Sequence, residues 1–442
     1  MVNLEKKLAI GTGYAALLAL AYAPWHDALF LGQRELLAIP FWSGSVVSSS
    51  GVANILLVVV LYLLFLATTL VSWKRNAPSI SAILFVLFPS YLLLRSSPFD
   101  QHALTSLSNF TLSSLMIYLV FDSVRYSEIG LLLRKHGLKV LLVSYTLAII
   151  LPFLISIPDY RIFQQFGSVD RYRGFLGEGQ PIGFLGATIA VWGGAEILTS
   201  RRVSALSGLA IAIGFLGIYL NILRIALIVF GTFFLFAAVR EYFYGKKKWA
   251  LSFVSLWILA IVVFSTGNFS VKSNQGYVYG TDGSRIANGT FVSPVKNPKE
   301  SIELVSTDIR NLDRIMLTSH RTRTWYFLWD KTRSSRMLGA GTGSSSRILK
   351  VNHWAVPEPG SEYVRALIDH GVFGLIIMII VFVGMAIRNR RNAAFFFFTS
   401  GMIFFLSDII LIIPSFGYVP IFLGALAYAS KGYGGHEVIK SI

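Results

Sequence analysis

The sequence has 442 residues, of which 54% are hydrophobic and 14% are charged, with no cysteine and a formal net charge of +17. Soluble domains contain roughly 25% charged residues, so this composition excludes an ordinary soluble enzyme and predicts a membrane protein. The lack of cysteine in the sequence excludes a disulfide framework, a thiolate metal site and a cysteine nucleophile.

Apolar windows of about 20 residues, the length needed to cross a bilayer, recur along the chain. The first window ends in Ala21-Tyr22-Ala23, a pattern typical of signal-peptide cleavage, but Glu5 before it and Pro24 after it favour a retained helix. The expected fold class is an all-α polytopic membrane protein. We place twelve transmembrane helices near residues 8–24, 52–72, 79–94, 104–121, 138–157, 181–199, 203–221, 223–239, 249–266, 364–387, 393–413 and 416–430.

The basic residues alternate between the two ends of these expected helices. With a cytoplasmic amino terminus, the inner loops and the two termini carry 19 of the 39 Lys and Arg residues. The short outer loops carry five: Arg34, Arg95, Arg161, Arg171 and Arg173. By the positive-inside rule, this asymmetry predicts that both termini are cytoplasmic. The basic residues are then explained by the orientation of the helices in the membrane, so the positive net charge does not predict a nucleic-acid partner.

One polar stretch, residues 267–363, separates the first nine expected helices (1–266) from the last three and a short tail (364–442). Its 97 residues include 13 basic and 8 acidic side chains. Because long loops are translocated regardless of charge, we expect a large extracytoplasmic loop domain. Its positive surface suits an anion presented from the membrane, such as a lipid phosphate or diphosphate.

The composition of this loop changes along its length. The segment from Gly267 to Asn297 is rich in Gly, Ser, Asn and Thr and predicts irregular or short-stranded structure. Residues 300–317 and 319–336 predict helices. The run from Gly339 to Gly343 lacks the Gly-Lys-Ser of a phosphate-binding Walker loop. This run therefore favours a turn that permits close approach over a phosphate cradle.

Several arginines are candidates for binding an anion. Arg224 begins the eighth expected span, where a charge beside hydrocarbon is costly unless it faces the protein interior or a ligand; snorkelling to the interface is the alternative. Arg173, with Arg171, precedes a glycine-containing turn and could grip phosphate oxygens, or belong to a solvated basic loop. Arg321 and Arg323 begin an expected helix, where they could bind an anion or serve only in packing and surface solvation.

Three residues are candidates for removing a proton from an attacking hydroxyl. His353, Glu358 and Glu362 lie within ten residues at the expected outer mouth of span ten. A structural role for His353 and a dipole-stabilised helix start for Glu362 are the alternatives. Glu362, Arg365 and Asp369 share one helix face by their spacing. The loop shows no Asp-x-Asp, His-x-x-x-His or Cys cluster, so we expect neither a metal nor another cofactor.

The chain resembles the O-antigen ligase and polymerase superfamily, which are bacterial envelope glycosyltransferases of the GT-C type. The resemblance spans roughly residues 140–400. It rests on short pieces in a fixed order around one long outer loop: Arg173-Gly174-Phe175, the stretch from Asn221 through Arg224 to Leu227, Arg321 or Arg323 with Trp325, the run from Leu338 to Gly343, and Glu362 to Gly374.

This resemblance implies a metal-independent and inverting transferase on the outer face of the bacterial inner (plasma) membrane. Its donor would be a glycan on a polyprenyl-diphosphate carrier, and its acceptor a sugar hydroxyl on a growing glycan or on the lipid core. Carried over by position, Arg224 and either Arg321 or Arg323 would bind the leaving diphosphate, with Arg173 as a helper. Membrane lipids would surround the helices. Ligase and polymerase differ only in the acceptor.

The sequence departs from the family at one position. Where the family usually reads His-Asn-Glu/Asp-Tyr, this chain reads Gly360-Ser361-Glu362-Tyr363. Either His353 replaces the missing histidine, or a carboxylate such as Glu358 or Glu362 does, or that chemistry is lost.

A polytopic transporter or a flippase for lipid-linked glycans, without catalytic activity, is the alternative function. Such a protein should show charged or Gly/Pro-interrupted helices near the bilayer midplane in corresponding halves. Here the charges gather at the outer end and in one asymmetric loop, which favours the enzyme.

Overall fold

The structure is a computed structural model. It describes residues 2–25, scattered positions between 60 and 71, and residues 127–154, 163–166, 169–172, 180–221, 223–265, 278–279, 285–287, 290–291, 321–341, 343–352, 359–390, 392–404 and 419–429. Of the expected spans, 79–94 and 104–121 lie outside these residues, and 52–72 lies almost entirely outside them.

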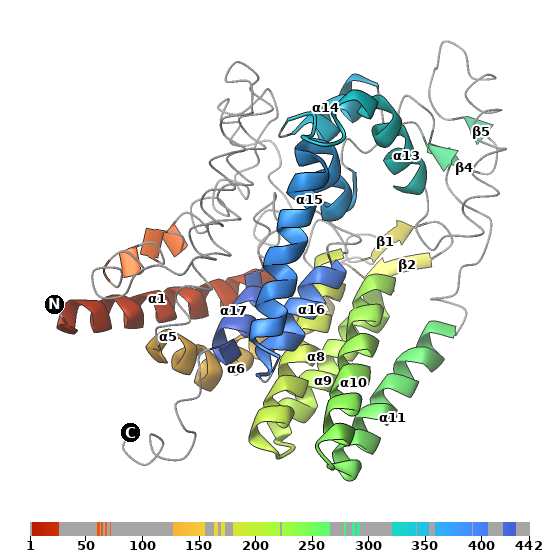
Figure 1. Ribbon diagram of the computed structural model, residues 1–442. Helices are drawn as coiled ribbons and strands as arrows, with labels where there is room; N and C mark the ends of the chain where they lie inside the picture. Colours follow the sequence, from red (N-terminus) through yellow and green to blue (C-terminus); the bar gives the residue numbers. More distant parts are fainter. Residues whose placement is uncertain are drawn as a thin grey trace.

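The described part of the chain is largely helical (Figure 1). Among the described residues, three helices are long and apolar enough to cross a membrane, and a bent pair within residues 362–384 adds a fourth if it counts as one span. The protein is therefore an α-helical membrane protein, while the number twelve stays a prediction. The main helices are α1 (Val2–Tyr22), α5 (Ser127–Leu132), α6 (Leu138–Leu154), α8 (Gln180–Ser200), α9 (Ala205–Asn221), α10 (Arg224–Phe243), α11 (Lys247–Ser265), α13 (Arg321–Lys331), α14 (Ser344–Val351), α15 (Glu362–Arg388), α16 (Ala394–Phe404) and α17 (Val419–Ala429).

Short strands form two antiparallel sheets. Strands β1 (Phe163–Phe166) and β2 (Val169–Tyr172) pair as a hairpin before α8, which the expectation of an all-α fold did not include. Strands β3 (Val278–Tyr279), β4 (Arg285–Ala287) and β5 (Thr290–Phe291) form a three-stranded sheet. They confirm short strands in the Gly- and Ser-rich half of the loop. In its second half, the helix expected over 319–336 is the shorter α13, followed by a 3₁₀ turn (Arg333–Ser335). The helix expected over 300–317 lies outside the described residues.

Helices α8 and α9 pack closely because glycines face each other at their crossing. A Cβ added to Gly186 would lie 2.6 Å from the carbonyl oxygen of Gly214, and one added to Gly193 would lie 2.8 Å from that of Ser207. Small residues that let two backbones approach are typical of helix pairs in membranes, where apolar burial alone does not drive association.

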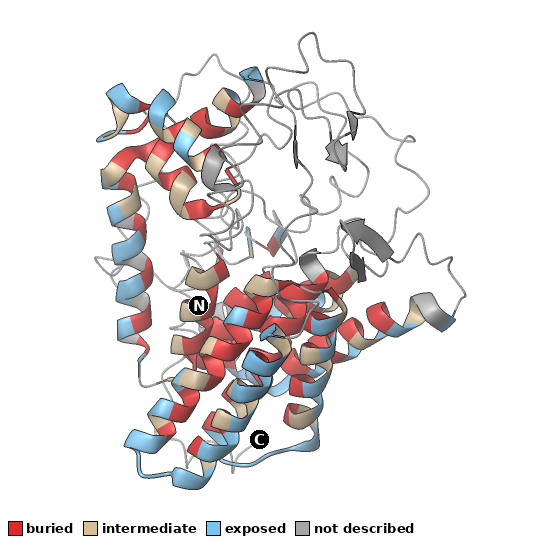
Figure 2. Ribbon diagram, turned by 90° about the vertical axis from the view of Figure 1, so that its right-hand side faces the viewer, coloured by how far each residue is buried: buried red, intermediate tan, exposed pale blue. Residues whose placement is uncertain are grey.

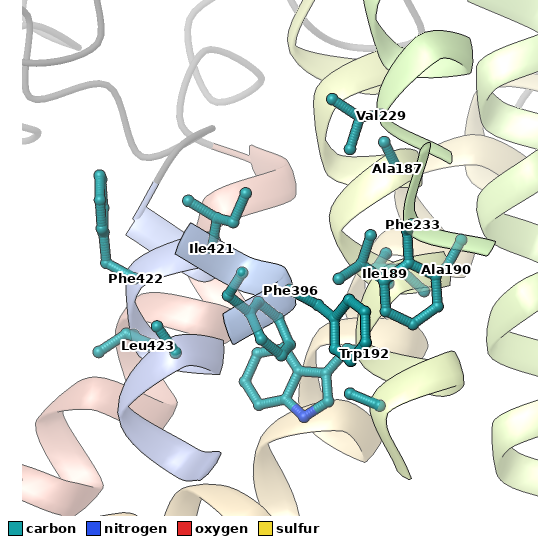
Figure 3. Packing of buried hydrophobic residues seen from close by; sticks show 14 of the residues in the cluster. Ala187, Ile189, Ala190, Trp192, Val229, Phe233, Phe396, Ile421, Phe422 and Leu423 are labelled. Carbon is teal, nitrogen blue, oxygen red and sulfur yellow. The ribbon is translucent and has the colours of Figure 1, made fainter. Parts of the chain in front are cut away.

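Aromatic side chains fill the space between α8, α10, α16 and α17 (Figure 3). Phe233 of α10 meets Phe396 of α16 edge-to-face at 4.9 Å, and Trp192 of α8 meets Phe397 at 5.8 Å. Buried residues gather on the inner faces of these helices, and exposed ones lie on the outside of the bundle (Figure 2). The outside includes many large apolar side chains, as expected for helices that face lipid.

The turns after α8 and α10 lie at one end of the bundle, because Arg201 forms an ion pair with the buried Glu241. The β1–β2 hairpin lies at the opposite end, where α10 begins (Figure 1). This arrangement agrees with the expected alternation, in which Arg201 and the lysines after α10 share one side and Arg171 and Arg224 share the other. The sequence assigns the first side to the cytoplasm.

Candidate functional site

A small cap, formed by α13, α14 and the first residues of α15, lies above the hairpin end of the bundle (Figure 1). Its own apolar centre consists of Leu328, Leu349 and Ile368, one from each helix. The indole N–H of Trp325 donates to the carbonyl oxygen of Pro359 at 2.6 Å, which ties α13 to the segment that leads into α15.

Helix α15 is interrupted at Gly371. Its backbone there has φ 71° and ψ −173°, a conformation that only glycine adopts readily. The interruption removes the helical bonds that the N–H groups of Val372 and Phe373 would make to the carbonyls of Ile368 and Asp369. All four groups need other partners, because unpaired backbone groups are costly away from water.

The glycine-rich turn supplies these partners. The N–H groups of Val372 and Phe373 donate to the carbonyls of Arg336 and Met337, at 2.9 and 3.4 Å. In return, the carbonyls of Ile368 and Asp369 accept from the N–H groups of Ala340 and Gly341, at 2.9 and 3.0 Å. Four bonds therefore replace the two that the helix lost.

This exchange of hydrogen bonds brings the backbones of Gly339 and Gly371 into contact. Gly339 has φ 78°, and a Cβ added there would overlap the carbonyl of Asp369 and the nitrogen of Gly371. A Cβ on Gly371 would overlap the carbonyl of Met337. The run from Gly339 to Gly343 is thus a turn that permits close approach, as its sequence predicted.

One buried carboxylate takes the free N–H groups of this turn. Asp369 accepts from the N–H of Gly343 at 2.9 Å on Oδ2 and from that of Ser345 at 2.7 Å on Oδ1. The groups that form a phosphate cradle elsewhere are therefore used by an internal anion. This finding favours the structural reading of the turn.

Arg365 lies fully buried between two carboxylates on one face of α15. Its Nη2 is 3.3 Å from Oε1 of Glu362, and its Nε is 3.7 Å from Oδ2 of Asp369. The shared face that the spacing predicted is confirmed. The single positive charge of the guanidinium is shared by the two carboxylates. No group of three potential metal ligands occurs among the described residues.

Glu362 is 0% exposed and sits in the first turn of α15. This position fits the alternative role, a carboxylate at a helix start that the helix dipole stabilises. His370, on the same helix next to Gly371, is also buried, at 3% exposure. The other two candidate bases, His353 and Glu358, lie outside the described residues.

Arg224 is the first residue of α10. The preceding residue, Leu223, is extended and offers no side-chain cap, so the first N–H groups of the helix lack that partner. Arg224 is half-buried, and no hydrogen bond or ion pair joins its side chain to another residue that the structure describes. A guanidinium beside the positive end of a helix is an arrangement suited to an anion.

The remaining arginine candidates are placed only by their backbone. Arg171 lies in β2, which contacts the bundle at α9, and Arg173 falls just past the end of that strand, outside the described residues. Arg321 and Arg323 lie in the first turn of α13. The structure therefore puts Arg171 and Arg224 at one end of the bundle, and Arg321 and Arg323 in the cap above it (Figure 1).

Sequence reasoning missed two features of this site. The interruption at Gly371 was inside a predicted continuous span, and the signal available was the polar run Asp369-His370-Gly371 within an apolar segment. Arg336, whose guanidinium lies 4.1 Å from the ring centre of Trp329, was also not singled out.

No family model matches this chain, and no curated protein matches its sequence.

Proposed function

We propose that this protein is a metal-independent glycosyltransferase of the O-antigen ligase or polymerase type, in the bacterial inner membrane. It moves a glycan from a polyprenyl-diphosphate carrier to a sugar hydroxyl. The observation that carries the proposal is Arg224: a half-buried cation at an uncapped helix N-terminus, without a partner among the described residues, at the end of the bundle that faces the cap.

The reaction proposed is a single displacement. The acceptor hydroxyl oxygen attacks the anomeric carbon, the bond from that carbon to the diphosphate oxygen breaks, and a base takes the hydroxyl proton. The charge that develops on the diphosphate is held by Arg224, with Arg173 and one of Arg321 or Arg323 as further ligands. Positive groups already fixed where charge develops are usually the largest contribution to catalysis.

The base is assigned to His353 or Glu358. Glu362 fits this role less well, because its carboxylate is buried and paired with Arg365. We assign Glu362, Arg365 and Asp369 to positioning. Asp369 holds the glycine-rich turn through two backbone hydrogen bonds, and Arg365 joins Asp369 to Glu362 at the start of α15.

The test is to delete the gene in its host and complement it with the wild type, with Arg224→Ala and with Arg333→Ala. Arg333 is a matched control, because it is an exposed arginine of the cap that pairs only with the exposed Asp330 in the described structure. Surface polysaccharide and lipid-linked intermediates are separated on a gel, and membrane insertion is checked by immunoblot.

We expect Arg224→Ala to lower glycan transfer by about 100-fold or more, as removal of a donor to a developing oxyanion does, and Arg333→Ala to leave it unchanged. Free polymer accumulating on the carrier would identify a ligase, and a core with a single repeat unit a polymerase. An unchanged glycan profile in the deletion strain would contradict the enzyme and favour a transporter. Normal transfer by inserted Arg224→Ala would contradict the diphosphate site.

A further inference from the structure

An apolar groove runs along the outside of the bundle between α9 and α11. Its volume is about 760 Å³. One wall follows α9 and includes Val203 just before the helix and Ile211 and Tyr219 within it, and Phe230 of α10 lies between the walls. The wall on α11 includes Trp249, Phe253, Leu256 and Val263.

The groove is chemically simple. The side-chain polar groups in its lining are the hydroxyls of Ser252 and Tyr219 and the indole N–H of Trp249, and neither α9 nor α11 contains an acidic residue. Such a lining suits hydrocarbon chains. A volume of this size is within the range of small-molecule sites, roughly 300–1,000 Å³.

The two ends of the groove differ in charge. At the end where α9 and α11 begin, Arg202 precedes Val203, and Lys246, Lys247 and Lys248 precede Trp249; all four cations are exposed. We call these four residues the cation cluster. The nearby Arg201 is not part of it, because it pairs with the buried Glu241. Among the described residues, the opposite end has two arginines: Arg224, half-buried at the start of α10, and Arg171 of the β1–β2 hairpin.

We propose that this groove binds an anionic phospholipid, with its acyl chains along α9 and α11 and its phosphate at the cation cluster. The charge difference between the ends places the headgroup in the leaflet on that side, which the sequence assigns to the cytoplasm. Basic residues next to membrane helices attract anionic headgroups. The proposal does not depend on glycan transfer.

Binding is tested with the purified full-length protein in detergent. The probes are phosphatidylglycerol, which is anionic, and phosphatidylcholine with the same chains, which is zwitterionic. Binding is followed by native mass spectrometry and by the rise in Tm that a ligand of the folded state produces. We expect phosphatidylglycerol to bind more tightly, and its advantage to fall as salt is raised.

Two variants separate the headgroup from the chains. Arg202→Gln/Lys248→Gln should weaken phosphatidylglycerol binding by on the order of tenfold at low salt and leave phosphatidylcholine binding unchanged. The matched control is Lys135→Gln/Lys139→Gln, which removes two exposed cations elsewhere in the described chain and should change neither. Gly208→Leu should weaken both lipids, because a Cβ there has open space towards the groove and meets only Val203, at 3.9 Å.

Three results would overturn the proposal. Equal binding of the two phospholipids would show that the cation cluster does not select the headgroup. An equal loss in the Lys135/Lys139 variant would show that the effect is non-specific charge. Displacement of phosphatidylglycerol by a polyprenyl phosphate, with the same sensitivity to Gly208→Leu, would assign the groove to the donor's carrier chain. Loss of glycan transfer in Arg224→Ala tests the proposed function alone and leaves this groove unaffected.

Discussion

At the scale of single residues, the cap depends on one buried carboxylate with three partners. Asp369 is 1% exposed, accepts two backbone hydrogen bonds from the turn and pairs with Arg365. Breaking a buried pair by removing one charge is costly, because the other charge stays buried without compensation.

We therefore expect Asp369→Asn to lower the free energy of unfolding by about 3 kcal/mol, through the loss of the ion pair and the placing of an amide N–H against a backbone donor. The control is Asp330→Asn, which breaks an exposed pair with Arg333 at 3.5 Å and should change stability by less than about 1 kcal/mol. Thermal unfolding in detergent measures both variants. Equal Tm values for the two variants would contradict the role given to Asp369.

The charge of Arg224 and its shape make separable contributions. Lysine keeps the charge but not the planar fork that binds two phosphate oxygens at once. If the diphosphate is bound in this way, Arg224→Lys should transfer glycan at a rate between those of the wild type and Arg224→Ala. A lysine variant as inactive as the alanine variant would show that charge alone contributes little there.

At the scale of elements, the interruption of α15 is the feature that joins the cap to the membrane helices. Replacing Gly371 by alanine forces a side chain into a left-handed conformation and against the carbonyl of Met337. Strain of this kind costs about 1–3 kcal/mol.

Gly371→Ala should therefore lower Tm and release the turn. Gly384→Ala is the control on the same helix, because a Cβ there meets nothing within 4 Å and alanine has the higher helix propensity. Limited proteolysis of the cap, with Tm, compares the two variants. Faster cleavage in Gly384→Ala than in Gly371→Ala would contradict the role of the interruption.

At the scale of the whole molecule, the described structure places the cap and the cation cluster at opposite ends of the bundle (Figure 1). The native chain has no cysteine, so a single introduced thiol can report sidedness. Tyr326→Cys lies on the exposed face of α13, and Lys247→Cys lies at the start of α11.

A membrane-impermeant maleimide applied from the outer side should label Tyr326→Cys in intact cells whose outer membrane has been made permeable. It should label Lys247→Cys only after the inner membrane is opened. Detergent-solubilised protein, in which both thiols react, is the control. Labelling of both in intact cells, or the reverse order, would contradict the orientation.

Much of the helical framework could be predicted because apolar length is encoded locally. The helices α8 to α11 begin and end within a few residues of the spans expected from the sequence. The shared face of Glu362, Arg365 and Asp369 followed from helical spacing alone. Two features could not be predicted because they depend on contacts between segments far apart in the sequence. The interruption of α15 depends on hydrogen bonds to the turn after α13. The groove beside the cation cluster exists only because α9 and α11 lie side by side.

The bonds across Gly371 also have a consequence for synthesis on the ribosome. The turn at residues 336–341 is made about 30 residues before its partner in α15. Until Val372 and Phe373 have been added and have reached the turn, the two broken ends of the helix have no protein partners for their backbone groups. The upper part of this span can therefore reach its final form only once the turn is available to it, and the turn is the part that is synthesised first.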